Sequence, residues 1–101
     1  RRVDLEIGIG YDDSIDDARA IIQELIDADT RILRDPEPAI IISSLGDSSV
    51  NFAVRSWVNA DDFWPVHNKL IEDIKKTFDE KGISIPYPQM DVHLPKSEET
   101  K

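Results

Sequence analysis

Cysteine is absent from the 101-residue sequence, and histidine occurs only at His67 and His93. The lack of cysteine excludes a disulfide framework, a thiolate zinc site and a thiol nucleophile. The two histidines lie far apart in sequence and lack the close His or Glu partner of a metal-ligand pattern, and the chain has no nucleophile elbow or phosphate-binding loop. The sequence therefore predicts no catalytic residue, no metal site and no cofactor, so we do not expect an enzyme.

Basic residues and long apolar runs are also scarce. The chain has 12 Lys and Arg against 21 Asp and Glu, so its net charge is 12 − 21 = −9. This balance argues against a nucleic-acid partner and against direct contact with an anionic membrane surface. The longest apolar run, residues 39–42, is far shorter than the ~20 residues of a membrane span. The chain begins with Arg1 rather than Met, which predicts a segment of a longer protein.

The first element predicted by the pattern is a strand. From Val3 to Tyr11 the odd positions are apolar and the even positions are polar or glycine, which is the period of a strand with one buried face. Gly8 and Gly10 leave the other face bare. We expect a neighbouring backbone or subunit to come close at these two glycines.

Two segments have the apolar spacing of amphipathic helices. Ser14 precedes the first and is a candidate N-cap, which predicts a helix over residues 15–28. The second follows the N-cap candidates of residues 59–62, carries Pro65 in its first turn and stops at Gly82. Both helices have one polar face, so each is expected to cover one side of a sheet.

The remaining elements are predicted to be strands. Residues 39–45 and 50–58 are rich in β-branched side chains and flank a short loop with Gly46, as in a hairpin. Shorter alternating runs occupy residues 83–85 and 90–94. The order β-α-β-β-α-β with an appended strand predicts an α+β, ferredoxin-like sandwich, with two helices on one face of an antiparallel sheet.

Two features of this fold have both structural and functional interpretations. Trp57 and Trp64 bracket the turn into the second helix, and such rings serve either intrachain packing or an interface. The acidic run of residues 12–17 lacks the spacing of a calcium loop, so it is interpreted as acids that complement a helix start.

Four segments, in order, resemble one family. The last of them ends in Ile-Pro-Tyr-Pro-Gln, and together they extend from about Val3 to Leu94. They are residues 7–12, 29–33, 45–57 and 78–89. The chain resembles the C-terminal cytosolic region of the bacterial small-conductance mechanosensitive channel (MscS-like) family.

This resemblance implies a piece of a homo-heptameric channel in the bacterial inner membrane. Such a channel opens under bilayer tension and releases ions and small osmolytes during hypo-osmotic shock. The pore and a β-domain would lie upstream in the same chain and are not part of this sequence. Residues 1–89 would form a wall of the cytosolic vestibule, and residues 90–101 a barrel strand with a polar tail. The acidic charge of the wall would bias which ions collect near it.

The resemblance also implies intersubunit contacts. The barrel strand would pair with neighbouring subunits, with either its apolar or its polar positions toward the lumen. Its residues are Met90, Asp91, Val92, His93 and Leu94. The interface residues that we expect elsewhere are Gly8, Gly10, Trp57, Trp64 and Tyr87.

Two other functions were weighed. A stand-alone ferredoxin-like regulatory domain that binds a small ligand is the alternative, and it rests on fold analogy. An acylphosphatase-like enzyme would need a phosphate-cradling loop after the first strand. The acidic Tyr11-Asp12-Asp13 at that position would repel phosphate, which argues against this enzyme.

Overall fold

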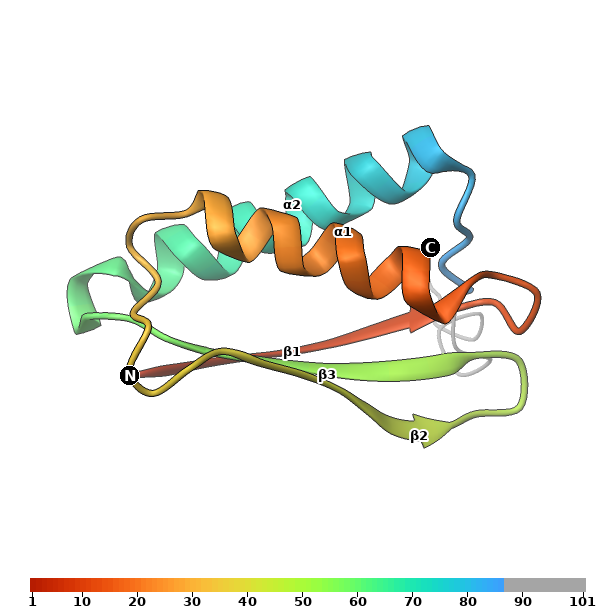
Figure 1. Ribbon diagram of the computed structural model, residues 1–101, viewed down its shortest axis with the longest axis horizontal. Coiled ribbons are helices and arrows are strands. Elements are labelled where there is room, and N and C mark those ends of the chain that lie inside the picture. Colours follow the sequence, from red (N-terminus) through yellow and green to blue (C-terminus); the bar gives the residue numbers. More distant parts are fainter. Residues whose placement is uncertain (87–101) are drawn as a thin grey trace, which may run out of the picture.

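Three strands and two helices form the part of the chain described by the computed structural model, residues 1–86. Both strand pairs are antiparallel, in the order β1-β3-β2, and both helices cover the same face of the sheet (Figure 1). The elements are β1 (Arg2–Ile9), α1 (Ile15–Ala28), β2 (Ala39–Leu45), β3 (Val50–Trp57), a 3-10 turn (Ala60–Asp62) and α2 (Phe63–Lys81). The predicted α+β class is confirmed.

The central strand β3 sets which face of the sheet is buried. Its residues alternate strictly between buried and half-buried, because successive side chains point to opposite faces. In the pairing with β1, Val3 lies opposite Ser56 and Leu5 opposite Val54, so the buried positions of the two strands share one face. Figure 1 shows the helices over that face and none over the other within the described residues.

Local signals position α1 as the sequence predicts. The Ser14 hydroxyl accepts a hydrogen bond from the Asp17 amide at 3.1 Å, which satisfies one of the unpaired N–H groups of the first turn. Ala18, Ile22 and Ile26 recur at helical spacing and are fully buried. The helix therefore begins at its cap and packs its apolar stripe on the sheet.

The second helix has the predicted end but a different start. It stops at Gly82, which adopts the left-handed φ of 77°, and its buried residues are Val66, Leu70, Ile74 and Phe78. A 3-10 turn precedes it, and neither Asn59 nor Asp62 makes the side-chain cap predicted for residues 59–62. The turn itself bonds the Asp62 amide to the Asn59 carbonyl at 2.9 Å, so the start is closed by backbone.

One predicted strand is wrong. Residues 83–86 have no strand geometry, although residues 83–85 alternate as a strand would. The segment is held instead by Ile83, only 7% exposed, and by hydrogen bonds from Ser84 to the Asp13 carboxylate. The expected strand over residues 90–94 and Tyr87 lie outside the described residues.

Candidate assembly surfaces

The described chain begins and ends at opposite ends of an elongated molecule, whose extents are 41 × 30 × 24 Å. Figure 1 shows the N-terminus beside the start of α2, while Ile83–Pro86 lies at the other end beside the turn that leads from β1 into α1. The predicted interface residues divide between these ends. Trp64 lies on the first turn of α2 near the N-terminus, whereas Gly8 lies at the end of β1 and Gly10 in the turn after it.

At the N-terminal end, the Arg1 side chain lies beside a group of aromatic rings. We call Arg1, Phe63, Trp64 and His67 the aromatic cluster. The Arg1 guanidinium lies 4.0 Å from the Phe63 ring centroid, and the Trp64 ring packs edge-on against Phe63 at 4.9 Å and against His67 at 5.2 Å. Trp64 is nevertheless 61% exposed. A large ring held in place by neighbours but open to solvent is typical of an interface anchor.

Trp57 does not join this cluster. It is half-buried on the sheet face that the helices leave open, opposite Arg2 of β1. Its carbonyl accepts a hydrogen bond from the Leu33 amide at 2.8 Å, which ties the arm after α1 to the end of β3. The two tryptophans that bracket the turn in sequence thus lie on different surfaces.

The open sheet face carries balanced charge. Arg2 pairs with Asp4 at 2.8 Å, and Arg55 lies directly opposite Asp4 across the strands. Glu6 accepts a hydrogen bond from the Ser43 hydroxyl at 2.7 Å, a contact that reaches from β1 to β2. Such exposed pairs add little to stability, so this face is polar but close to neutral.

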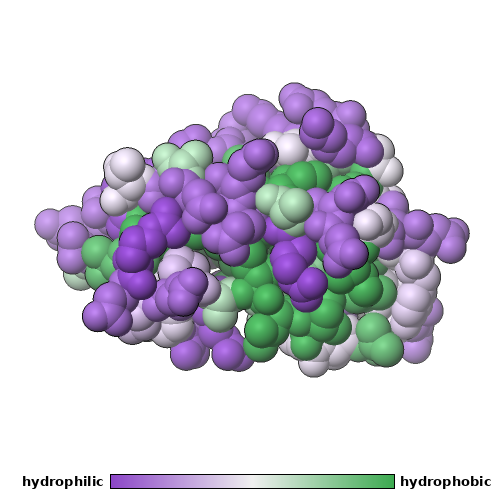
Figure 2. Space-filling view, in the orientation of Figure 1, coloured by the Kyte–Doolittle hydropathy of each residue, from purple (hydrophilic) through white to green (hydrophobic). Residues whose placement is uncertain are grey.

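The edge strand β2 presents apolar surface. Ile41 is 42% exposed and Leu45 is 68% exposed. Figure 2 shows apolar surface gathered between α1 and β2, with hydrophilic residues over most of the remaining face. An irregularity in the pairing between Ile42 and Ser44 bends this edge, as in strands that avoid unwanted pairing.

At the other end of the molecule, one carboxylate oxygen accepts three hydrogen bonds. Oδ2 of Asp13 accepts from the Gly10 amide at 2.9 Å, from the Ser84 amide at 3.0 Å and from the Ser84 hydroxyl at 2.8 Å. Burial raises the pKa of Asp13, but the hydrogen bonds from Ser84 and Gly10 outweigh it and the pKa is lowered. We call Gly10, Asp13 and Ser84 the exit latch.

Within the described residues, side chains of the same chain come close to both glycines, where the sequence predicted a neighbouring backbone or subunit. A Cβ on Gly10 would lie 2.7 Å from the Ser84 hydroxyl, and a Cβ on Gly8 would lie 3.0 Å from the Asn51 side-chain oxygen. A side chain at position 10 would thus require the Ser84 hydroxyl to shift. A subunit contact at either position stays a prediction.

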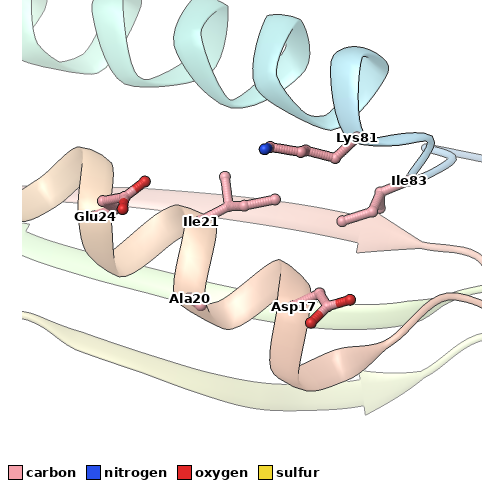
Figure 3. Close-up of a pocket in the computed structure, with 6 residues that line it drawn as sticks. All are labelled: Asp17, Ala20, Ile21, Glu24, Lys81 and Ile83. Atoms are coloured by element: carbon pink, nitrogen blue, oxygen red, sulfur yellow. The ribbon is translucent and has the colours of Figure 1, made fainter.

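A cleft of about 360 Å³ lies between α1 and the end of α2 (Figure 3). Its floor is apolar and its rim carries charges of both signs, with the Lys81 side chain extending across from α2. The lining residues are Asp17, Ala20, Ile21, Glu24, Lys81 and Ile83. The cleft contains no nucleophile or histidine, and no group of three or more His, Asp or Glu among residues 1–86 could hold a metal ion.

A partly buried ion pair fixes the arm that follows α1. The Arg31 guanidinium donates two parallel hydrogen bonds to the Asp29 carboxylate at 2.9 Å, and the Arg31 amide donates a third at 3.0 Å. These bonds lower the pKa of Asp29 against the opposing effect of burial. This pair was not identified from the sequence.

Sequence reasoning also missed Asp13 and Ser84. They are 71 residues apart, and Asp13 lay within an acidic run interpreted as a helix start. The only signal was the bare face at Gly10, which marked a close approach without identifying the partner. Of the two histidines, His67 belongs to the aromatic cluster and His93 lies outside the described residues.

Comparisons with known proteins agree with one another. The model of the family described as "Mechanosensitive ion channel MscS, C-terminal" matches residues 3–85. An uncharacterised MscS family protein of Synechocystis is 49% identical over 94 residues, which are 93% of this chain and 32% of that protein. The small-conductance mechanosensitive channel of Edwardsiella ictaluri is 43% identical over 94 residues, which are 93% of this chain and 33% of that protein.

The fold has a solved counterpart. The crystal structure of Helicobacter pylori MscS in the closed state matches 100% of this chain and 39% of that chain, with a TM-score of 0.79 and 30% identity. The chain thus spans about a third of the length of the curated relatives described above. No helix within residues 1–86 is long and apolar enough to cross a membrane.

Proposed function

Because the chain belongs to the MscS family of mechanosensitive ion channels, matching its C-terminal region, we propose that it builds the cytosolic cage of such a channel. In this role the domain is structural. It forms part of the vestibule wall on the cytoplasmic side of the bacterial inner membrane, and the pore belongs to the upstream part of the longer protein. The channel as a whole would release ions and small osmolytes on hypo-osmotic shock.

The observation that carries this proposal is the match of the whole chain to the closed-state Helicobacter pylori channel at a TM-score of 0.79. The fragment covers 39% of that chain, so it corresponds to a substantial body of the channel. The elongated shape supports the same role. A domain with its chain ends at opposite poles can be inserted in series between an upstream β-domain and a C-terminal strand.

Assembly would use contacts at both ends of the elongated domain. We infer a homo-heptamer in which residues 90–94 pair between subunits as a parallel barrel, since an unpaired strand in one chain can find partners in a ring. The exposed Trp64 would anchor the N-terminal pole, while Trp57, Gly8, Gly10 and Tyr87 are the other interface positions inferred from the sequence. The expected partners are further copies of the chain and its own upstream β-domain and pore.

The wall would also act as a coarse solute filter. The full chain carries a net charge of −9 per copy, which is large for a small domain, and a ring of copies multiplies it. Walls of one sign raise the local concentration of counter-ions, so cations would collect beside the cage. The filter would act by charge and opening size rather than by specific binding.

A chimeric channel tests the proposed function. The corresponding C-terminal third of the Edwardsiella ictaluri channel would be replaced by this chain, which is 43% identical to it over 94 residues. The chimera should restore survival of a channel-deficient bacterium after hypo-osmotic shock and give tension-gated currents in patches. A chimera that reaches the membrane in normal amounts but neither assembles nor conducts would contradict the proposal.

The interpretation as a regulatory domain has less support than the interpretation as a channel domain. It rests on fold analogy, whereas the channel domain rests on matches that extend over most of the chain. The cleft between α1 and α2 is bordered by mixed charges, a setting that favours no particular ligand class.

A further inference from the structure

We propose that Asp13 is the positioning residue for the C-terminal end of the domain, because the exit latch fixes the course of the chain after α2. The latch would give the chain the same direction up to Pro86 in every copy. Its effect on assembly rests on the proposed function, whereas its effect on residues 83–86 does not.

The geometry of the latch is that of a three-way acceptor. A single carboxylate oxygen, Oδ2 of Asp13, binds the turn after β1 through the Gly10 amide and the chain after α2 through two donors of Ser84. Hydrogen bonds to an ionised carboxylate are stronger than those between neutral groups. Two segments from opposite ends of the described chain are thereby joined at one atom.

The residues between α2 and Ser84 leave little freedom for the chain to take another course. Gly82 adopts its left-handed φ of 77°, and the Ile83 amide donates to the Phe78 carbonyl at 2.9 Å. This is the pattern of a Schellman cap, which reverses the chain after a helix. Ile83 is 7% exposed and its side chain lines the cleft beside Ile21 (Figure 3).

Gly10 makes the latch possible by leaving room for Ser84. An added Cβ would lie 2.7 Å from the Ser84 hydroxyl and 3.1 Å from Oδ2 of Asp13, and the first of these distances is below any ordinary contact. A side chain at position 10 would therefore force the Ser84 hydroxyl to move, and the Asp13 carboxylate would have to give way slightly. Gly10 thus leaves the space that Ser84 occupies, and Asp13 supplies the oxygen that Ser84 binds.

The latch replaces the strand that the sequence predicted for residues 83–85. A regular strand there would be held by a ladder of backbone hydrogen bonds. The latch instead holds one residue, Ser84, through hydrogen bonds to a side-chain carboxylate. A chain that is already fixed near its exit loses less conformational freedom when the following residues join a partner. Preorganisation of this kind would favour assembly without adding any contact between subunits.

The test uses the full 101-residue chain and two variants that break the latch by different means. Asp13→Ala removes the acceptor, and Gly10→Ala pushes Ser84 away. Asp12→Ala is the matched control, since it removes the same charge one residue earlier. Circular dichroism melts establish that each variant folds, and only folded variants enter the comparison.

The first readout is hydrogen exchange of the Ser84 amide. It should be protected in the parent chain and in Asp12→Ala, and exchange at least about tenfold faster in Asp13→Ala, the change expected from the loss of one hydrogen bond to a charged group. Gly10→Ala should accelerate it as well. Unchanged protection in both latch variants would overturn the proposal.

The second readout is the chain concentration at which half of the oligomer dissociates. It should rise in the latch variants and stay constant in Asp12→Ala. Lost Ser84 protection with unchanged dissociation would show that the latch does not serve assembly. A parent chain that is monomeric at every concentration would count against the proposed assembly, and Ser84 exchange would still decide whether Asp13 holds the exit segment.

Discussion

Ser56 offers a quantitative test of the packing described above. It is the one fully buried polar residue in the core of residues 1–86, lying on β3 opposite Val3, and its hydroxyl has no hydrogen-bond partner in the structure. Replacement by alanine keeps the backbone and Cβ and removes only the hydroxyl. We expect Ser56→Ala to stabilise the domain.

The magnitude follows from two opposing effects. Burying a hydroxyl without a partner costs about 1–3 kcal/mol in proteins, and alanine removes that cost. The space left by one oxygen atom lowers the gain by less than ~0.5 kcal/mol at ~24 cal/mol per Å³. The net stabilisation of Ser56→Ala is therefore about 1 kcal/mol. For a domain of this size it raises the melting temperature by roughly 4–8 °C.

The assay is thermal and urea unfolding at one fixed chain concentration, because assembly would make the melting temperature depend on concentration. Ser43→Ala is the control, since its hydroxyl is exposed and bonds Glu6 at the surface. The control should change the free energy of unfolding by less than ~0.5 kcal/mol. A loss of stability in Ser56→Ala would refute the reasoning, since it would mean that the hydroxyl has a partner.

Three further predictions concern other parts of the domain. Gly82→Ala should lower the free energy of unfolding by about 1 kcal/mol in urea titrations, because the left-handed φ of 77° disfavours a side chain, and an unchanged midpoint would contradict this. Asp29 has its pKa lowered below the usual 3.8 by Arg31, so its contribution is present above about pH 4 and is lost as the pH falls through the lowered value. Arg31→Leu should therefore flatten the acid limb of the stability profile, and an equally steep limb would disprove the role of the pair. Trp64→Ala should barely change the melting temperature at a concentration where the chain is monomeric, because the ring is 61% exposed. It should weaken assembly in light scattering, and equal assembly would remove Trp64 from the interface.

Where sequence signals are local, they predicted the structure closely. The residues of α1 are the predicted ones, because a cap at Ser14 and apolar residues at helical spacing act within a few turns. The hairpin and the stop at Gly82 likewise depend on neighbouring residues, and β3 alternates as expected. Short-range geometry determines these elements almost independently of the remaining fold.

Where contacts join residues distant in sequence, the hydrophobic pattern did not predict the structure. Three alternating residues, 83–85, could not reveal whether an edge of β1 would accept them as a strand, and a carboxylate 71 residues away holds Ser84 instead. The ion pair of Asp29 with Arg31 is local, yet the sequence does not reveal that the Asp29 side chain is buried to 8% exposure. Burial depends on packing that a periodic pattern does not describe.

The native mass of the chain tests the central claim most directly. Light scattering would compare the 101-residue chain with a chain that ends at Gln89 and so lacks the proposed barrel strand. The account predicts a heptamer that dissociates when the strand is removed. A dimer that keeps its mass after the truncation, or that forms only with a small ligand, would contradict the cage and favour a regulatory domain.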